Sequence, residues 1–505
     1  MKNKSRSFFL FLITLALFSS CSKKHAGGLL FDEERYNSLP RKAQLVSRSY
    51  ENLPSSVSLV SNTPYPGDQG SFSTCAAWAT SYAGMTTVDA LIHENTDRNY
   101  TTQNVFSPYY LYQMCNPYDV YGEDGMYMEV ALDFLKNTGV PLRSEREEML
   151  VDNFGYFDAA SEYSSSRLYK IGDYATLFSS DASSEQKILS VKKSLSQNKP
   201  VVISFLACNS FSYAREYWEP NFYESPANGG GHAMLVVAYD DDKRGGSFCI
   251  QNSWGRQWGK DGYVWVRYND FAEYTRGAYE LSRAIIGRSR TYEEPSEIEP
   301  ITPPYFEEPE PVKPPVQKKV LVYEGSFELP IRYEKEVMQL SFKDGVYKTT
   351  KPYDSYTRFQ LYMTNTKPCY VYALASDEAT GKANVIFPLE GTSPLLDYSE
   401  NTVAYPAEDK FIMLDDVKGT DYFVVLYSSE ELDIKDIAST YEKSVAEGLS
   451  GKENFYRRIQ AAVGIDRLVD PLMTDFSEDR VSFKAYSLEP QEEKILPILI
   501  QIEHD

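Results

Sequence analysis

The sequence predicts an α+β protein made of two globular domains joined by an extended linker. A chain of 505 residues is too long for one ordinary hydrophobic core. Residues 53–290 mix helical and strand patterns, whereas residues 320–505 are rich in strand patterns with one helical insertion. Between these two regions, residues 291–319 hold eight prolines and seven glutamates in 29 residues, a composition that favours an extended spacer.

The composition fits packed domains and argues against several classes of function. Hydrophobic residues make up 42 % of the chain, which is enough for two cores. The net charge of −21 argues against nucleic acid or an anionic membrane surface as a partner. Only four histidines are present and no C-x-x-C pair occurs, so we expect no metal site.

The first 20 residues have the features of a targeting segment. A basic start is followed by an apolar run, residues 8–18, that is too short to span a bilayer. The small residues before Cys21 make this region resemble a bacterial lipoprotein signal, in which that cysteine becomes the lipidated first residue. We expect residues 1–20 to be a signal peptide and Cys21 to anchor an exported protein in the bacterial cell envelope, facing the periplasm or the outside. The alternative is an ordinary cleaved signal peptide.

Residues 21–52 are polar and supply only a tether with one short helix, expected within residues 32–48. The domain that follows is predicted to contain a helix from Cys75 to about Leu91, because its larger apolar residues recur every three or four positions. Thr74 stands at the N-cap position of that helix. The other predicted elements are a helix over 187–198, a buried strand over 200–205, a buried strand over 232–239 and an antiparallel partner over 247–252.

Residues 320–505 are predicted to form a separate β-rich domain. The expected strands cover 320–323, 369–375, 383–387, 421–427, 481–485 and 495–502, and a helical stretch over 433–463 ends at Gly464. Three of these segments resemble a β-rich C-terminal domain of exported bacterial proteins whose function is not established. The sequence of this domain offers no nucleophile and base together. We expect an accessory module that binds a protein or a component of the cell envelope.

Four residues of the first domain supply the groups that a nucleophilic cysteine needs. Cys75 lies at a helix start, where the helix dipole favours the thiolate. His232 follows three glycines at the start of a buried strand and can serve as the base. Asn252 ends the next strand, where its amide can orient the imidazole ring. The side-chain NH₂ of Gln69 and the backbone N–H of Cys75 can hold an oxyanion.

These residues stand in motifs that resemble those of the papain family of cysteine peptidases over residues 53–286. The glutamine precedes the cysteine by six residues, His232 lies between Gly231 and Ala233, and residues 251–263 follow the pattern Asn-Ser-Trp-Gly-x-x-Trp-Gly-x-x-Gly-Tyr. The resemblance implies a two-lobed fold with a helical lobe and an antiparallel β-barrel-like lobe. It also implies that Cys75 is the nucleophile and His232 the general acid and base. Asn252 would then orient the ring, Gln69 line the oxyanion hole, and the tryptophan after Ser253 shield the His–Asn hydrogen bond.

The resemblance further implies where a substrate lies and where this chain departs from the family. The substrate-binding candidates are Ser73, Gly125, Ala233 and Trp258. Phe72, Ser73 and Ala76 differ from the residues that the family carries beside the nucleophile, so primary specificity is not predicted.

The cysteine count allows little cross-linking. Glu123 stands where the family carries one half of a disulfide, and Phe72 replaces the other half. Of the cysteines not yet assigned, at most one pair can bridge within the first domain, and Cys249 is expected to be a buried thiol. These cysteines are Cys115, Cys208, Cys249 and Cys369.

We therefore expect an exported cysteine endopeptidase that hydrolyses peptide or protein substrates through a thioester, with no metal or organic cofactor. A transpeptidase or amidase acting on cell-wall peptides would use the same residues, and a non-catalytic peptide-binding protein is the third possibility. The long pro-domain of the family has no room between Cys21 and Leu53. We expect an enzyme that is made active or is restrained only by a short N-terminal segment.

Overall fold

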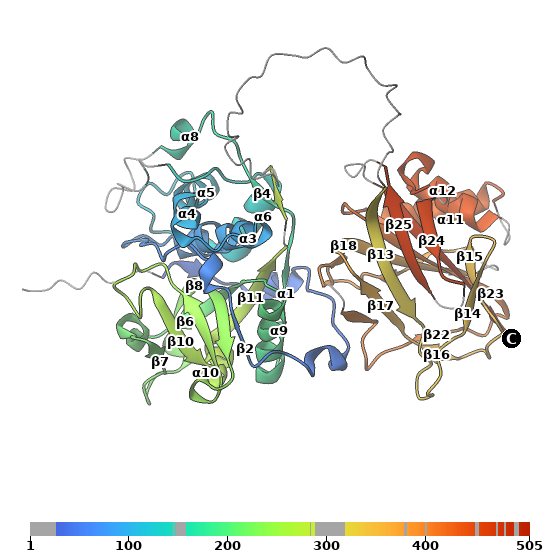
Figure 1. The fold of residues 1–505 in the computed structure, drawn as a ribbon, viewed down its shortest axis with the longest axis horizontal. Coiled ribbons are helices and arrows are strands. Elements are labelled where there is room, and N and C mark those ends of the chain that lie inside the picture. Colours follow the sequence, from blue (N-terminus) through green and yellow to red (C-terminus); the bar gives the residue numbers. More distant parts are fainter. Residues whose placement is uncertain are drawn as a thin grey trace, which may run out of the picture.

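The computed structural model describes residues 27–144, 147, 158–282, 284–287, 319–377, 381–398, 401–449, 454–470, 473–478, 481–488 and 494–505 (Figure 1). The predicted signal peptide, Cys21 and residues 291–318 of the predicted linker lie outside these ranges. The described residues form two domains, each with its own hydrophobic core.

The first domain is built on an eight-stranded sheet with the order β5-β11-β6-β8-β9-β10-β7, and β2 pairs with β8. β6 and β8 are antiparallel neighbours at its centre, and their apolar runs are buried on both faces. The strands predicted over 200–205, 232–239 and 247–252 are confirmed as β6, β8 and β9. The strands are β2 (Ser56–Ser58), β5 (Tyr174–Thr176), β6 (Val201–Ala207), β7 (Tyr217–Trp218), β8 (Gly230–Asp240), β9 (Ser247–Gln251), β10 (Tyr263–Arg267) and β11 (Thr275–Leu281).

A helical stretch from Cys75 to Ile92 packs against this sheet, as the sequence predicts. It begins with α2 (Cys75–Ala77), is π-helical over Trp78–Met85 and continues as α3 (Thr86–Ile92). The stretch is buried on all sides rather than along one face. Its threonine and serine hydroxyls at positions 80, 81 and 87 donate to carbonyl oxygens four residues earlier, which satisfies them without water.

The remaining helices of this domain surround that buried stretch and the sheet (Figure 1). The helix predicted over 187–198 is confirmed as α9, which carries a capping box at its start. The elements are α4 (Arg98–Gln103), α5 (Pro108–Cys115), α6 (Met128–Asn137), α8 (Ala159–Glu162), α9 (Ser184–Ser196) and α10 (Tyr268–Tyr274), with the short strands β3 (Met126–Tyr127), β4 (Lys170–Ile171) and β12 (Ile285–Ile286).

Residues 27–50 run along the first domain and then between the two domains. β1 (Leu29–Leu30) pairs in parallel with β3, and α1 (Glu33–Ser38) follows. The single helix expected within residues 32–48 is interrupted. Leu39 precedes a proline, which disfavours the helical conformation, and it is extended with a ψ of 150°. A 3₁₀ turn over Ser47–Tyr50 ends this segment.

The C-terminal domain packs two sheets face to face around one core. The sheet orders are β21-β17-β13-β25-β24 and β14-β15-β26-β23-β18-β19. The strands predicted here are all confirmed, but the final two lie in different sheets and do not pair with each other. The strands are β13 (Val320–Glu328), β14 (Leu340–Lys343), β15 (Val346–Thr349), β16 (Arg358–Phe359), β17 (Leu361–Asn365), β18 (Cys369–Asp377), β19 (Asn384–Phe387), β20 (Leu395–Leu396), β21 (Thr402–Tyr405), β22 (Ile412–Met413), β23 (Gly419–Ser428), β24 (Thr474–Phe476), β25 (Ser482–Ser487) and β26 (Ile495–His504).

Two helices cover the outer face of the larger sheet, α11 (Ile434–Ala446) and α12 (Phe455–Val463). Alternate residues of β23 therefore face different cores. Phe423 and Val425 face the space between the sheets, whereas Val424 and Leu426 face the helices. Gly464 ends α12 with a φ of 93°, as the predicted stop requires. Among the residues that the structure describes, no helix combines the length and apolar character needed to cross a membrane.

Candidate active site

Cys75 is the first residue of the buried helical stretch, and its side chain is fully buried. Thr74 occupies the N-cap position as expected, but its side chain makes no capping hydrogen bond, so the predicted cap is wrong in that detail. The backbone of Ala233, on β8, bonds to the Cys75 thiol. The sheet thus brings the residue after His232 into contact with the sulfur.

His232 and Asn252 are joined by a hydrogen bond. The ring Nε2 lies 2.7 Å from Oδ1 of Asn252. The same oxygen accepts the backbone N–H of Ser253 at 2.7 Å, so the amide presents its oxygen to two donors and Nε2 carries a proton. Proton exchange with a substrate is then left to Nδ1. The ring of Trp254 stacks on the imidazole, with 4.5 Å between the ring centroids and 26° between the planes.

Gln69 is buried and its amide is held at both ends. Its Oε1 accepts the hydroxyl of Ser253 at 2.6 Å, and its Nε2 donates to the carbonyl oxygen of Phe72 at 2.7 Å. Ser253 therefore joins the amide predicted for the oxyanion hole to the amide that orients the imidazole. In the sequence, Ser253 stands out only as one residue of the Asn-Ser-Trp-Gly motif. Its position between the two amides in the fold is what gives it a structural role.

The thiol of Cys75 is protonated in this arrangement, contrary to the thiolate expected at a helix start. Burial raises the pKa of Cys75 to about 12. Backbone hydrogen bonds from Ala233, Ala76, Cys75 itself and Leu29 lower the pKa, but they do not offset the burial. The contact with Leu29 shows what covers the sulfur.

Residues 27–31, which we call the covering segment, lie over Cys75. The carbonyl oxygen of Gly28 accepts the backbone N–H of Met126 at 3.0 Å in the β1–β3 pair. Leu29 is buried in the same hydrophobic cluster as Cys75. The approach to β8 is so close that a Cβ on Gly231 would lie 2.2 Å from the Leu29 carbonyl oxygen. No pattern in the sequence predicts this segment, because five residues are too few to show a periodicity.

Three of the four predicted substrate-binding residues meet the covering segment or the sulfur. A Cβ on Gly28 would lie 2.5 Å from Ser73, and a Cβ on Gly125 would lie 2.3 Å from the Gly28 carbonyl oxygen. Ala233 contacts the Cys75 thiol. Trp258 lies behind Trp254 in an aromatic cluster and donates its indole N–H to a backbone carbonyl at 3.1 Å, so the structure gives it a packing role.

Among the residues that the structure describes, the other cysteines add no cross-link. The five described cysteines are all free thiols, and Cys249 is buried as predicted. Within the described ranges, no group of three or more His, Cys, Asp or Glu side chains is arranged to hold a metal ion.

The comparisons with known proteins point to one family. Residues 63–281 match the family model described as papain family cysteine protease. Residues 63–281 form a papain-family domain. The predicted papain-like fold is thereby confirmed for this part of the chain, together with its mixed α and β content.

Curated relatives match only parts of this chain. An uncharacterized peptidase C1-like protein of Acanthamoeba polyphaga mimivirus is 24 % identical over 215 residues, which cover 41 % of this chain and 65 % of the relative. The P34 probable thiol protease of Glycine max is 31 % identical over 99 residues, which cover 20 % and 26 %. Cathepsin K of Mus musculus is 26 % identical over 156 residues, which cover 30 % and 42 %. The chain thus spans less than two thirds of the length of these relatives.

Among solved structures, the chain is similar to xylellain, a cysteine protease from Xylella fastidiosa. The TM-score is 0.40 at 24 % identity, over 51 % of this chain and 96 % of xylellain.

Proposed function

We propose that this chain is a cysteine peptidase that hydrolyses peptide bonds and that the covering segment keeps it latent. The observation that carries the proposal is the hydrogen-bonded pair of His232 and Asn252, with 2.7 Å between the bonded atoms, next to Ala233, whose backbone bonds to the Cys75 thiol at the helix start. The match of residues 63–281 to the papain family supports the same chemistry.

The reaction begins once the covering segment has left Cys75. The thiol gives its proton to Nδ1 of His232, and the thiolate attacks the carbonyl carbon of the scissile peptide bond. The backbone N–H of Cys75 and the amide of Gln69 stabilise the oxyanion. The imidazolium then protonates the leaving amine, the C–N bond breaks, and a thioester on Cys75 remains.

Water completes the cycle. His232 takes a proton from the water molecule as it attacks the thioester, and the carboxylic acid product leaves as the Cys75 sulfur recovers a proton. Throughout these steps Asn252 keeps the proton on Nε2 and holds the ring plane. Trp254 keeps water away from that hydrogen bond.

Cys75→Ala tests the proposal. The wild-type chain and the variant are first freed of the covering segment by limited proteolysis and are then incubated with a denatured protein. We expect cleavage by the wild type and none by the variant. Equal cleavage by both would refute the role of Cys75. Mass spectrometry of the products, with and without an added amine, distinguishes hydrolysis from transpeptidation. A chain that binds the substrate and cleaves nothing would be a peptide-binding protein.

We also propose that the chain is exported and anchored to the cell envelope by a lipid on Cys21. The support is the basic start, the short apolar run and the small residues before Cys21. Labelled palmitate should enter the wild-type chain and not Cys21→Ala. Equal labelling of both would contradict the anchor.

A further inference from the structure

Residues 40–46, which we call the strap, connect the edges of two different sheets. On the first domain, Thr176 of β5 donates to the carbonyl oxygen of Pro40 at 3.0 Å, and Lys42 donates to that of Thr176 at 2.9 Å. β5 is the edge strand of the eight-stranded sheet. The strap therefore extends that sheet by a short strand.

The strap pairs with the C-terminal domain as well. Arg41 exchanges hydrogen bonds of 2.7 Å with the backbone of Gly391 and Ser393. Two more backbone hydrogen bonds join the strap to β21. Ala404 donates to the carbonyl oxygen of Gln44 at 3.1 Å, and Val46 donates to that of Thr402 at 3.0 Å. β21 is itself the edge strand of its sheet. Both domains thus satisfy an open sheet edge with the same stretch of backbone.

The side chains of the strap are shared in the same way. Ala43 and Leu45 are buried and belong to the core cluster of the C-terminal domain. Val46 is buried too. The C-terminal domain therefore completes part of its core with residues that come from the other end of the chain.

Lys42 lies in a buried site with charged groups from both domains. It pairs with Glu280 of the first domain, and its ammonium lies 3.9 Å from the centre of the Tyr398 ring of the C-terminal domain. Lys199 of the first domain lies 3.3 Å from Glu280 and 2.8 Å from Asp397. The exposed fractions of these four charged side chains are 3–4 %. Two cations and two anions balance there, so withdrawal of Lys42 leaves an uncompensated negative charge.

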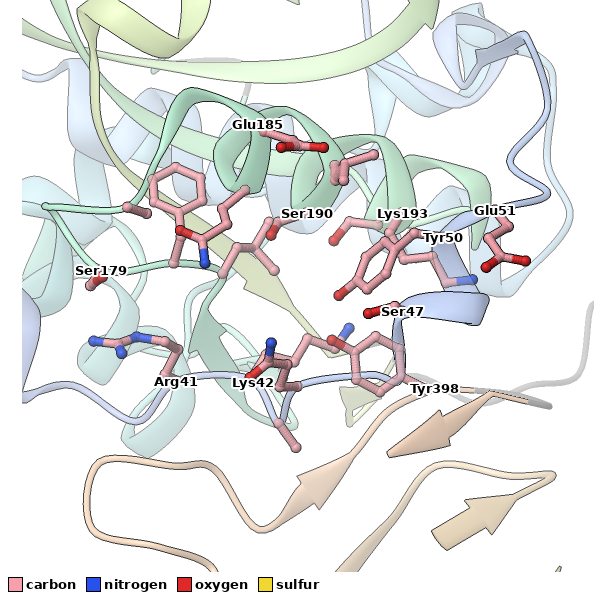
Figure 2. Close-up of a pocket in the computed structure, with 18 residues that line it drawn as sticks. Arg41, Lys42, Ser47, Tyr50, Glu51, Ser179, Glu185, Ser190, Lys193 and Tyr398 are labelled. Carbon is pink, nitrogen blue, oxygen red and sulfur yellow. The ribbon is translucent and has the colours of Figure 1, made fainter. Parts of the chain in front are cut away.

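Figure 2 shows the strap between helix α9 and the strands of the C-terminal domain, with Lys42 beside Tyr398. A cavity of about 590 Å³ lies between the strap and α9. The strap is therefore held by its hydrogen bonds to the two sheet edges, by the burial of Leu45 and by the ion pair of Lys42. Packing against α9 contributes less to its position.

Apart from the buried pair of Lys199 and Asp397, the direct side-chain contacts described between the two domains are polar and partly exposed. Tyr370 donates to the carboxylate of Asp173 at 3.1 Å, and Lys136 lies 3.1 Å from Glu431. Pairs of this kind contribute little at a surface. The apolar burial between the domains comes in large part through the strap.

We propose that the strap holds the C-terminal domain against the papain-family domain, so that the domain arrangement depends on the N-terminal segment. The strap and the covering segment belong to one stretch of chain, joined through α1. Loss of that stretch would uncover Cys75 and free the C-terminal domain together. That last consequence rests on the proposed peptidase function, whereas the hold of the strap does not.

The test uses the full chain carrying Cys75→Ala, which prevents self-cleavage. Leu45→Asp places a charge in the C-terminal core, and Lys42→Met removes the cation from the charge site while it keeps an apolar side chain. Lys187→Met is the matched control, because Lys187 is also a buried lysine but donates to Ala272 and Thr275 within the first domain. Hydrogen exchange is followed at the amides of Thr176, Ser393 and Ala404, which donate to the strap. Small-angle scattering gives the maximum dimension.

We expect exchange at these three amides to be at least tenfold faster in Leu45→Asp and severalfold faster in Lys42→Met, with a larger maximum dimension in both. Lys187→Met should leave both measurements unchanged. Unchanged exchange in both strap variants would overturn the proposal, and so would faster exchange with an unchanged dimension. If Leu45→Asp does not fold, Lys42→Met decides alone. Because no readout involves catalysis, a failure here is distinct from a failure of the proposed function.

Discussion

Gly28 is the position at which a single substitution should displace the covering segment. Its φ is 102°, which a residue with a Cβ adopts only with strain, and an added Cβ would lie 2.5 Å from backbone atoms of Ser73. The strain alone costs about 1–2 kcal/mol, and backbone atoms at that distance cannot yield cheaply. We expect Gly28→Val to move residues 27–31 away from Cys75.

The consequence for the thiol can be calculated. Burial raises the pKa of Cys75 to about 12 while the segment is in place. A thiol of that pKa is thiolate to about 3 parts in 100,000 at pH 7.5, whereas a solvated thiol of pKa about 8.5 is thiolate to roughly one part in ten. Uncovering the sulfur therefore raises the thiolate fraction by a factor of about 10³. The helix start and the imidazole would lower the pKa further.

The assay is the pH dependence of alkylation of Cys75 by iodoacetamide, read by mass spectrometry of the peptide that carries it. We expect the midpoint of the rate profile to fall by three or more pH units in Gly28→Val. Gly345→Val is the control, because Gly345 also has a positive φ, of 80°, but has open space around its Cα. An unchanged midpoint in a folded Gly28→Val protein would refute the argument that the covering segment sets the pKa of Cys75.

Three further substitutions give separate tests. Gln69→Ala should lower kcat about 100-fold with little change in KM, because it removes one hydrogen-bond donor to the oxyanion. A kcat equal to that of the wild type would show that Gln69 does not stabilise the oxyanion. Asn252→Ala removes a hydrogen bond to the imidazole, which becomes charged, and such a bond is worth about 1.5–3 kcal/mol. The value of kcat/KM should therefore fall about 10- to 100-fold. An unchanged kcat/KM would mean that His232 needs no orienting amide. Arg458 is buried, with its guanidinium 5.0–5.7 Å from the centres of three aromatic rings. Arg458→Met should destabilise the C-terminal domain by about 1–2 kcal/mol in thermal unfolding without changing peptidase activity, and an unchanged melting temperature would contradict this.

The sequence predicts the buried elements well because their signals are local. β8 and β9 are continuous apolar runs joined by a glycine turn, and the structure has them as antiparallel neighbours. Trp254 and Asn252 lie in one short motif, and their contacts with His232 follow from the strand pairing.

What the sequence missed depends on contacts between distant parts of the chain. The covering segment and the strap have no periodicity, since each is extended and is placed by a sheet edge that lies about 90 or more residues away in sequence. The prediction of a thiolate at Cys75 was also wrong, because burial by distant parts of the chain raises the pKa of this thiol. A helix start lowers the pKa of a thiol locally, but the burial of Cys75 in the folded chain outweighs that effect. Pro40 is a local signal that could have predicted the break in the helix expected over residues 32–48. The pairing of the strap with the edges of two sheets has no such local signal.

The claim that Cys75 is the nucleophile is tested most directly by the mass of the peptide that carries Cys75 after a reaction with a substrate ester. Gly28→Val protein is mixed with an activated ester of a short peptide, quenched in acid within seconds and digested. We predict that the peptide carrying Cys75 gains the mass of the acyl group as a thioester, and that Cys75→Ala in the same background gains none. Turnover of the ester without an acyl group on Cys75, or an acyl group found on another residue, would contradict the assignment of Cys75 as the nucleophile.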